Sequence, residues 1–141
     1  MATVTVEVTG PAPVATVWER YLRPEAWTGW SPHLTHVSAT ARSIAPGVSG
    51  TVTALGVVPA RFEILHVDPT DRSWSWVVRV GPVRLALHHD VIAHCGQDDA
   101  PGTLARIRLE GPWPVLVTYR PLMRWAMRRL VSRETGPEEF R

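Results

Sequence analysis

The order of secondary-structure signals in this sequence predicts an α+β fold, in which one antiparallel sheet packs against a single long helix. Three observations support it. An isolated strand precedes two short helical segments, strand signals run almost without a break from about His33 to Glu110, and one amphipathic helix closes the chain. A lone helix cannot bury its apolar stripe by itself, so it must lie on the sheet. A curved sheet around one helix leaves a hollow, which is a typical binding site for small apolar molecules.

The N-terminal part of the chain is predicted to contain a strand and two short helices. Residues Met1–Val8 alternate between apolar and polar side chains, which is the period of a half-buried strand. The first helix, Pro13–Leu22, begins with a proline whose missing N–H costs nothing there. One face of it is apolar and consists of Val14, Val17, Trp18, Tyr21 and Leu22. The second helix, Pro24–Trp30, ends at Ser31-Pro32.

Six further strands are predicted between the short helices and the last helix. Turn signals divide this region at Pro46-Gly47, Gly56, Asp68–Asp71, Gly81-Pro82 and Gly96–Gly102. The resulting strands are approximately 33–42, 50–56, 58–67, 72–80, 83–94 and 103–110. Because the connections between them are short, we expect hairpins and therefore an antiparallel meander.

The last helix is predicted over Val117–Thr135, with an apolar face and a basic face. Its apolar stripe consists of Tyr119, Leu122, Met123, Ala126, Met127, Leu130 and Val131. The basic residues are Arg120, Arg124, Arg128, Arg129 and Arg133. Such a face is usually the solvated side of an amphipathic helix, and it could also contact an acidic partner such as an acyl-carrier protein. Gly136-Pro137 ends the helix.

Composition indicates one folded domain, residues 1–136, followed by a frayed tail at 137–141. The chain has 141 residues, of which 45% are hydrophobic and 20% charged. A net charge of +2 is too small to indicate a nucleic-acid or membrane partner. All 15 basic residues are arginine, which suggests GC-rich codon usage and a bacterial source.

We find neither a signal peptide nor a membrane-spanning run, so we expect a cytoplasmic protein. The single cysteine, Cys95, excludes an internal disulfide.

Several stretches of the sequence resemble the START-like (SRPBCC) superfamily, and more narrowly its polyketide cyclase/dehydrase and lipid-transport branch. They are Ala12–Trp18, Arg23–Pro32, Pro46–Gly50, Arg61–Pro69 and the terminal helix, and together they cover nearly the whole chain. The resemblance implies a helix-grip fold: a seven-stranded curved antiparallel sheet wrapped around a long C-terminal helix, with two short helices between strands 1 and 2. It also implies a deep cavity for hydrophobic ligands. Members include cyclases, dehydratases, lipid carriers and receptors, so the fold does not determine the chemistry.

His89 is the first candidate for catalysis. In the strand 83–94 it shares an apolar, inward face with Val83, Leu85, Leu87 and Val91. A histidine in a ligand cavity can act as a general acid or base, because its ordinary pKa of about 6.5 lies near working pH. The alternative is a core histidine that bonds to a neighbouring carbonyl.

Three other polar residues are weaker catalytic candidates. Tyr119 could donate a proton or hold a substrate carbonyl, and Arg79, if it points inward, could bind a substrate carboxylate. Glu63 is expected on the outer face, but a β-bulge would turn it inward. His88 and Asp90 are adjacent on the other face of their strand, and without a third ligand we predict no metal site and no cofactor.

Aromatic and aliphatic residues are predicted to line the cavity. Trp74 and Trp76 share one face of a strand and would form a wall for a flat or ring-containing ligand, although ordinary core packing also explains them. The family resemblance implies that Trp30 and Trp113 lie at the entrance loop and the start of the last helix, where they could line the mouth. The remaining predicted contacts are Phe62, Leu87, Met123 and Met127.

Two functions fit these residues. The first is a cofactor-independent cyclase, aromatase or dehydratase of bacterial secondary metabolism, acting on a polyketide-like chain that is free or bound to a carrier protein. The cavity would fold the substrate into a reactive conformer. His89 would move the proton, and Tyr119 or Arg79 would polarise a carbonyl. The alternative is a non-catalytic carrier or sensor of a hydrophobic metabolite or lipid.

Overall fold

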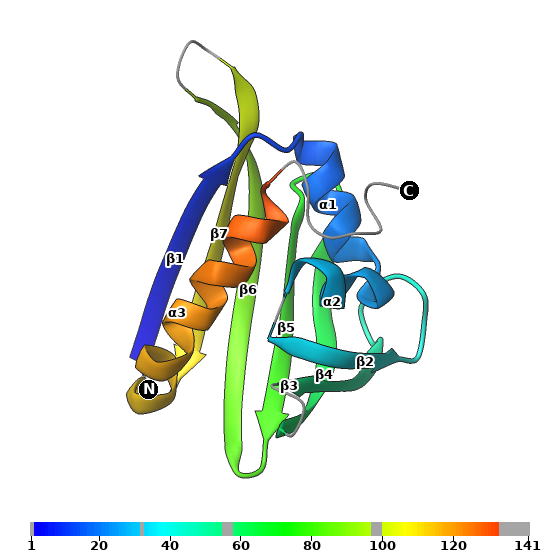
Figure 1. Cartoon of the computed structure of the whole chain (residues 1–141). Coiled ribbons are helices and arrows are strands. Elements are labelled where there is room, and N and C mark those ends of the chain that lie inside the picture. The colour runs from blue at the N-terminus through cyan, green and yellow to red at the C-terminus, as the bar shows by residue number, and fades with distance from the viewer. Residues whose placement is uncertain (1, 32, 55–57, 97–99, 133–141) are drawn as a thin grey trace.

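The computed structural model describes residues 2–31, 33–54, 58–96 and 100–132 (Figure 1). The helices are α1 (Val14–Leu22), the short 3-10 helix η1 (Pro24–Ala26), α2 (Trp27–Trp30) and α3 (Trp113–Leu130). The strands are β1 (Ala2–Gly10), β2 (Leu34–Ala39), β3 (Ser49–Ala54), β4 (Val58–Asp68), β5 (Ser73–Val80), β6 (Val83–Cys95) and β7 (Pro101–Gly111). The predicted helix stop at Gly136-Pro137 and the tail at 137–141 lie outside the described residues.

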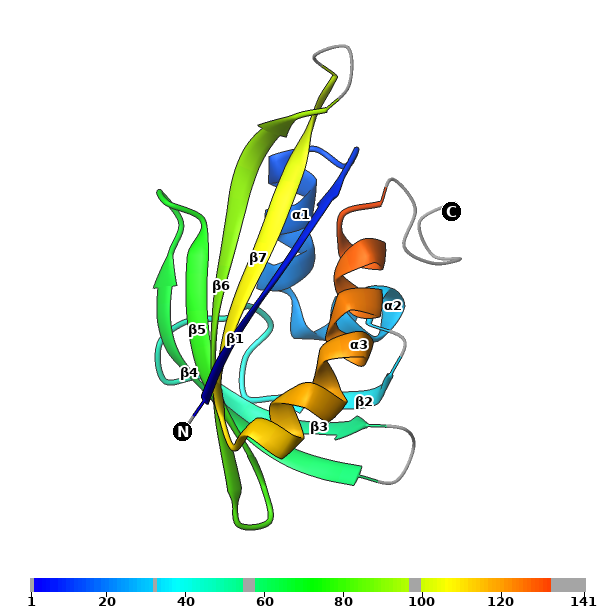
Figure 2. The same cartoon turned by 90° about the vertical axis from the view of Figure 1, so that its left-hand side faces the viewer.

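All seven strands form one antiparallel sheet in the order β1-β7-β6-β5-β4-β3-β2. Strands β2 to β7 therefore form the predicted meander, and β1 returns to pair with β7. The sheet is strongly curved, and α1, α2 and α3 lie on its concave side (Figure 2). The apolar face of each strand points to that side, where it packs against the helices to form the core.

Helix α3 begins at Trp113, four residues before the predicted start. In the sequence, the prolines on either side of Trp113 predicted a loop rather than the start of a helix. Pro112 is extended and occupies the N-cap, and Pro114 lies in the first turn, where a helix needs no N–H. At the other end, the buried side chain of Arg20 on α1 donates from Nη1 to the carbonyl oxygens of Leu130 (2.6 Å) and Ser132 (2.7 Å). Arg20 thus supplies a hydrogen bond to the last carbonyl of the helix and another to the carbonyl of Ser132 just beyond it.

The strand register places Glu63 and Arg79 on the outer face of the sheet. A β-bulge does occur in β4, but it lies between Ile64 and His66, after Glu63, which stays exposed. Arg79 is exposed as well and lies opposite Arg61 and Arg84 on the neighbouring strands. The condition for a catalytic role of Arg79, an inward side chain, is therefore not met, because Arg79 lies on the outer face.

The glycine turn before β3 has two structural roles. Gly47 has a φ of +91°, which suits a residue without a Cβ. Gly50 lies against β2, and a Cβ at this position would clash with the backbone oxygen of Ser38. Gly50 therefore allows β2 and β3 to pair closely, and Gly47 allows the turn that leads into β3.

Candidate functional site

A cavity of about 590 Å³ lies between the concave face of the sheet, α2 and α3. This volume is in the usual range for small-molecule sites. None of the described residues that line it is Arg, Lys, Asp or Glu. The strands contribute Val52, Ala60, Trp74, Trp76, Val78, Val80, Val83, Leu85, Leu87, His89 and Ile107 to its walls. The helices contribute Trp27, Trp30, Pro114, Val115, Thr118, Tyr119, Leu122, Met123 and Ala126.

Five of the eight predicted ligand contacts lie in these walls, and three do not. Trp30, Trp74, Trp76, Leu87 and Met123 line the cavity, as do the catalytic candidates His89 and Tyr119. Phe62 is buried behind it, because the rings of Trp27 and Trp76 pack on it at 5.5 and 5.2 Å. Met127, one turn beyond Met123, is fully buried in the core. Trp113 is 66% exposed at the start of α3 and lies outside the lining.

His89 is buried in the cavity wall and is held by Trp74. The two rings stack at 3.9 Å with 7° between their planes, and Nδ1 lies 3.3 Å from the Trp74 carbonyl oxygen. A carbonyl only accepts hydrogen bonds, so Nδ1 carries the proton and Nε2 is left as the basic nitrogen. Burial lowers the pKa of His89 to about 3, which the hydrogen bond to Trp74 only partly offsets. The imidazole is therefore neutral and weakly basic at neutral pH.

A second buried histidine, His33, pairs with Tyr119. Its Nε2 lies 3.0 Å from the Tyr119 hydroxyl, and its Nδ1 lies 3.4 Å from Ser31 Oγ. Burial lowers the pKa of His33 to about 4 and raises that of Tyr119 to about 12, so both groups are neutral at pH 7. Depending on the tautomer of His33, the phenol offers the cavity either its hydrogen or its oxygen lone pairs.

Sequence reasoning assigned no role to His33, although it considered Tyr119. The only local signal was a polar residue directly after the Ser31-Pro32 break. The contact joins residues that are 86 positions apart, and it exists only because the start of β2 faces the first half of α3.

The aromatic wall also contains buried donors without acceptors. The indole nitrogens of Trp74 and Trp76, and the hydroxyl of Tyr21, have no hydrogen-bond partner among the described residues. Tyr21 packs edge-on against Trp74 and His89 at 5.3 Å, and burial raises its pKa. An unmet buried donor costs about 1–3 kcal/mol. These three donors, which lie close to the cavity, are therefore unpaired among the described residues.

Across the described part of the chain, no three His, Cys, Asp or Glu side chains are grouped so that they could hold a metal ion. His88 and Asp90 contact each other on the outer face at 3.3 Å, and Arg106 is also 3.3 Å from the Asp90 carboxylate. No helix in the same residues is long and apolar enough to cross a membrane.

Comparison with solved structures confirms the helix-grip fold. The structure titled "Crystal structure of Ara h 8.0201" has a TM-score of 0.63 at 14% identity, and the match covers 92% of this chain and 97% of that one. A putative uncharacterized protein from Bacillus thuringiensis has a TM-score of 0.75 at 10% identity, with 92% and 96% covered. At these identities the likeness shows the fold alone.

Comparison of the sequence with known families and proteins is more specific. No curated protein matches the chain. The family model described as "Polyketide cyclase / dehydrase and lipid transport" matches residues 1–136, which is nearly the whole sequence and agrees with the expected resemblance. The chain therefore belongs to the polyketide cyclase/dehydrase and lipid-transport family.

Proposed function

We propose that the protein binds an uncharged, largely apolar small molecule in the cavity between the sheet and α3. The observation that carries this proposal is a hollow of about 590 Å³ without a charged side chain among its described lining residues. Burying an unpaired charge costs several kcal/mol, so a charged ligand would find no compensation there. The two histidines do not change this, because both are neutral at pH 7.

The polar groups of the wall favour a ligand that also carries a hydrogen-bonding oxygen. Tyr119 is the phenol on the α3 side, 3.0 Å from His33 Nε2. A carbonyl or hydroxyl group on the ligand would suit its hydroxyl. The flat indole faces suit a ring system.

A carrier or sensor role follows most simply from this chemistry. His89 has a pKa of about 3 and bonds to a backbone carbonyl, so it is a poor proton acceptor at neutral pH. The predicted third catalytic group, Arg79, lies on the opposite face of the sheet. The cavity as built is better suited to enclosing a molecule than to transforming it.

Binding of Nile red, a neutral apolar dye, tests the cavity directly. Val78 faces the hollow, so Val78→Trp should fill part of it and weaken dye binding at least roughly tenfold. Ile92→Trp adds the same ring at an exposed position outside the cavity and is the matched control. Equal loss in both variants, or no binding by the wild type, would refute the proposal.

A second candidate function is a cyclase or dehydratase of bacterial secondary metabolism, and the His33–Tyr119 pair favours it. A phenol held by a neutral imidazole can donate a hydrogen bond to a substrate carbonyl and stabilise the charge that develops on it. The cavity would then fold a polyketide-like chain for ring closure or loss of water.

Turnover of a linear poly-β-ketone thioester, followed by mass spectrometry, tests this second function. Tyr119→Phe keeps the ring and removes the hydroxyl, so it should slow product formation by about a hundredfold while dye binding stays within a few-fold. If Tyr119→Phe and His89→Ala both left turnover unchanged, these catalytic roles would be wrong. A ligand recovered without chemical change would favour the carrier.

A further inference from the structure

The solvent-facing side of α3 combines bulky apolar groups with arginines. Within its 18 residues the helix has four arginines and no acidic residue. We define the α3 ridge as Trp113, Val117, Arg120, Arg124, Trp125 and Arg128. At about 100° per residue these six side chains fall within an arc of about 140°. They form one continuous surface, and it is opposite to the buried stripe.

The apolar members of the α3 ridge are unusually open to solvent. Trp113 is 66% exposed, Val117 58% and Trp125 51%. Single exposed apolar residues are common on protein surfaces. Two tryptophans and a valine on one helix face are different, because they are grouped with the arginines in one mixed apolar and basic surface.

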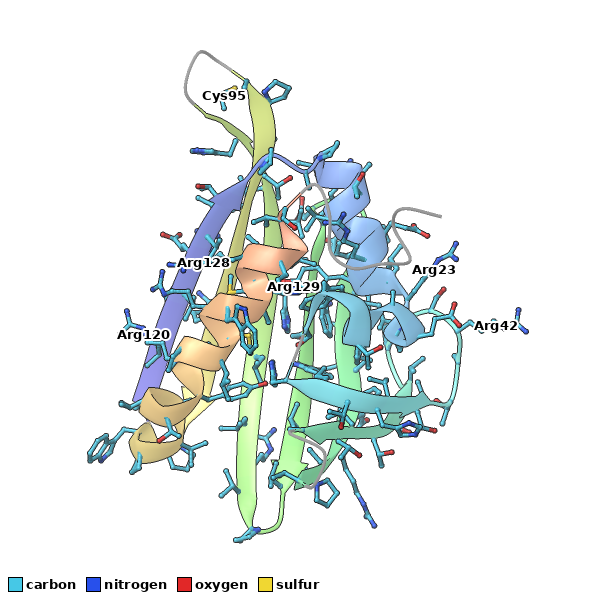
Figure 3. All side chains as sticks on the ribbon, viewed as in Figure 1. Arg23, Arg42, Cys95, Arg120, Arg128 and Arg129 are labelled. Carbon is cyan, nitrogen blue, oxygen red and sulfur yellow. The ribbon has the colours of Figure 1, made fainter. Side chains whose placement is uncertain are left out.

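The basic members of the α3 ridge have no ion-pair partner in the part of the chain that the structure describes. Arg120, Arg124 and Arg128 repeat at i+4 spacing, and none forms a hydrogen bond or ion pair with a described residue. Figure 3 shows Arg120 and Arg128 along the same helix, pointing into solvent. Like charges at this spacing destabilise a helix slightly. An anionic partner would remove that repulsion.

The ridge lies beside the opening of the cavity. Pro114 and Thr118 are exposed to solvent and also line the cavity, and they are on the same half of α3 as Trp113 and Val117. Val58, at the start of β4, shares both properties. A surface bound by the ridge would therefore be close to the opening.

From these observations we propose that the α3 ridge binds the surface of an anionic lipid bilayer. In helices that lie in the membrane interface, tryptophan rings enter the headgroup region and basic side chains meet lipid phosphates. The α3 ridge offers both kinds of side chain on one face, because the opposite face of α3 is buried in the core. Trp113 and Trp125 are 12 residues apart, about 18 Å along the helix, so they would anchor both ends of the ridge in a flat surface. An acidic protein would match the charge, but it would need a separate pocket for each indole.

The test is co-sedimentation of the protein with vesicles of phosphatidylcholine alone or with phosphatidylglycerol. The wild type should bind only the anionic vesicles, and 0.5 M salt should release it. Replacing Arg120, Arg124 and Arg128 by glutamine should weaken binding roughly a hundredfold. Trp113→Ala and Trp125→Ala should each weaken it as well, with unchanged circular dichroism.

Two matched controls test whether vesicle binding depends on the α3 ridge itself or only on the total charge and exposed apolar surface of the protein. The triple change of Arg61, Arg79 and Arg84 to glutamine removes the same charge from the outer face of the sheet and should bind like wild type. Leu65→Ala removes an equally exposed apolar side chain from β4 and should also have little effect. Equal losses in both arginine triples would overturn the proposal. So would wild-type binding by the tryptophan variants, or binding to an acidic carrier protein without binding to vesicles.

The vesicle experiment is independent of what the cavity holds. Val78→Trp, which fills part of the cavity, should bind anionic vesicles as well as the wild type does. Loss of vesicle binding in the ridge variants with intact Nile red binding would support the bilayer contact. A protein that binds the dye and never binds vesicles would refute the bilayer contact and leave the proposed function standing.

Discussion

At the scale of single residues, the most informative groups are the two buried histidines. Strand alternation correctly predicted that His89 shares the inward face with Leu85 and Leu87. It could not predict the pKa of about 3, because that value depends on burial among the rings of Trp74 and Tyr21. His33 was missed for a related reason, since its partner Tyr119 belongs to a distant part of the chain.

These pKa values predict that mild acid destabilises the protein. Both histidines are neutral in the folded state well below pH 6.5, whereas in the unfolded state they take up protons as the pH falls through 6.5. The free energy of unfolding should therefore drop from pH 6.5 to about 4 for His33 and to about 3 for His89. The loss from pH 7 to pH 5 should be about 2 kcal/mol for each histidine.

Urea unfolding at several pH values measures this effect. His89→Leu should roughly halve the loss between pH 7 and pH 5, because His33 remains, whereas the exposed His66→Ala should keep the wild-type dependence. Identical slopes in His89→Leu and the wild type would show that His89 is not held neutral by burial.

At the scale of elements, periodicity predicted the kinds of helix and strand better than their ends. The start of α3 was placed four residues late, because prolines that suggest a loop are also acceptable in a first helical turn. The bulge in β4 was considered as a way to bring Glu63 inward, but its position between Ile64 and His66 leaves Glu63 outside. A bulge is set by how two strands pair, which one strand's sequence does not contain.

The sequence predicted the helices but not which of their residues contact the cavity or another helix. The stripe from Tyr119 to Met127 was expected to face the cavity as a unit. Tyr119 and Met123 do so, whereas Met127 is buried in the core beyond the cavity. Arg20 received no role from its local sequence, yet it caps the far end of α3 across 110 residues.

At the scale of the whole molecule, the element order and the quoted motifs were enough to predict the fold and the family. Seven strands, two short helices and one long helix can bury their apolar faces in few ways. Net charge was less informative. A value of +2 averages over the chain and conceals a helix with four arginines and no acidic residue. A cavity for an apolar ligand was predicted. That its described lining contains no charged side chain became clear only from the outer-face positions of Arg79 and Glu63.

The most direct test of the account compares the binding of a fatty alcohol and the fatty acid of the same chain length at pH 7, by isothermal titration calorimetry. The two ligands differ only in the charged carboxylate, which the described lining cannot compensate. We expect the alcohol to bind at least roughly a hundredfold more tightly than the acid. Equal binding, or tighter binding of the acid, would contradict the conclusion that the cavity selects uncharged molecules.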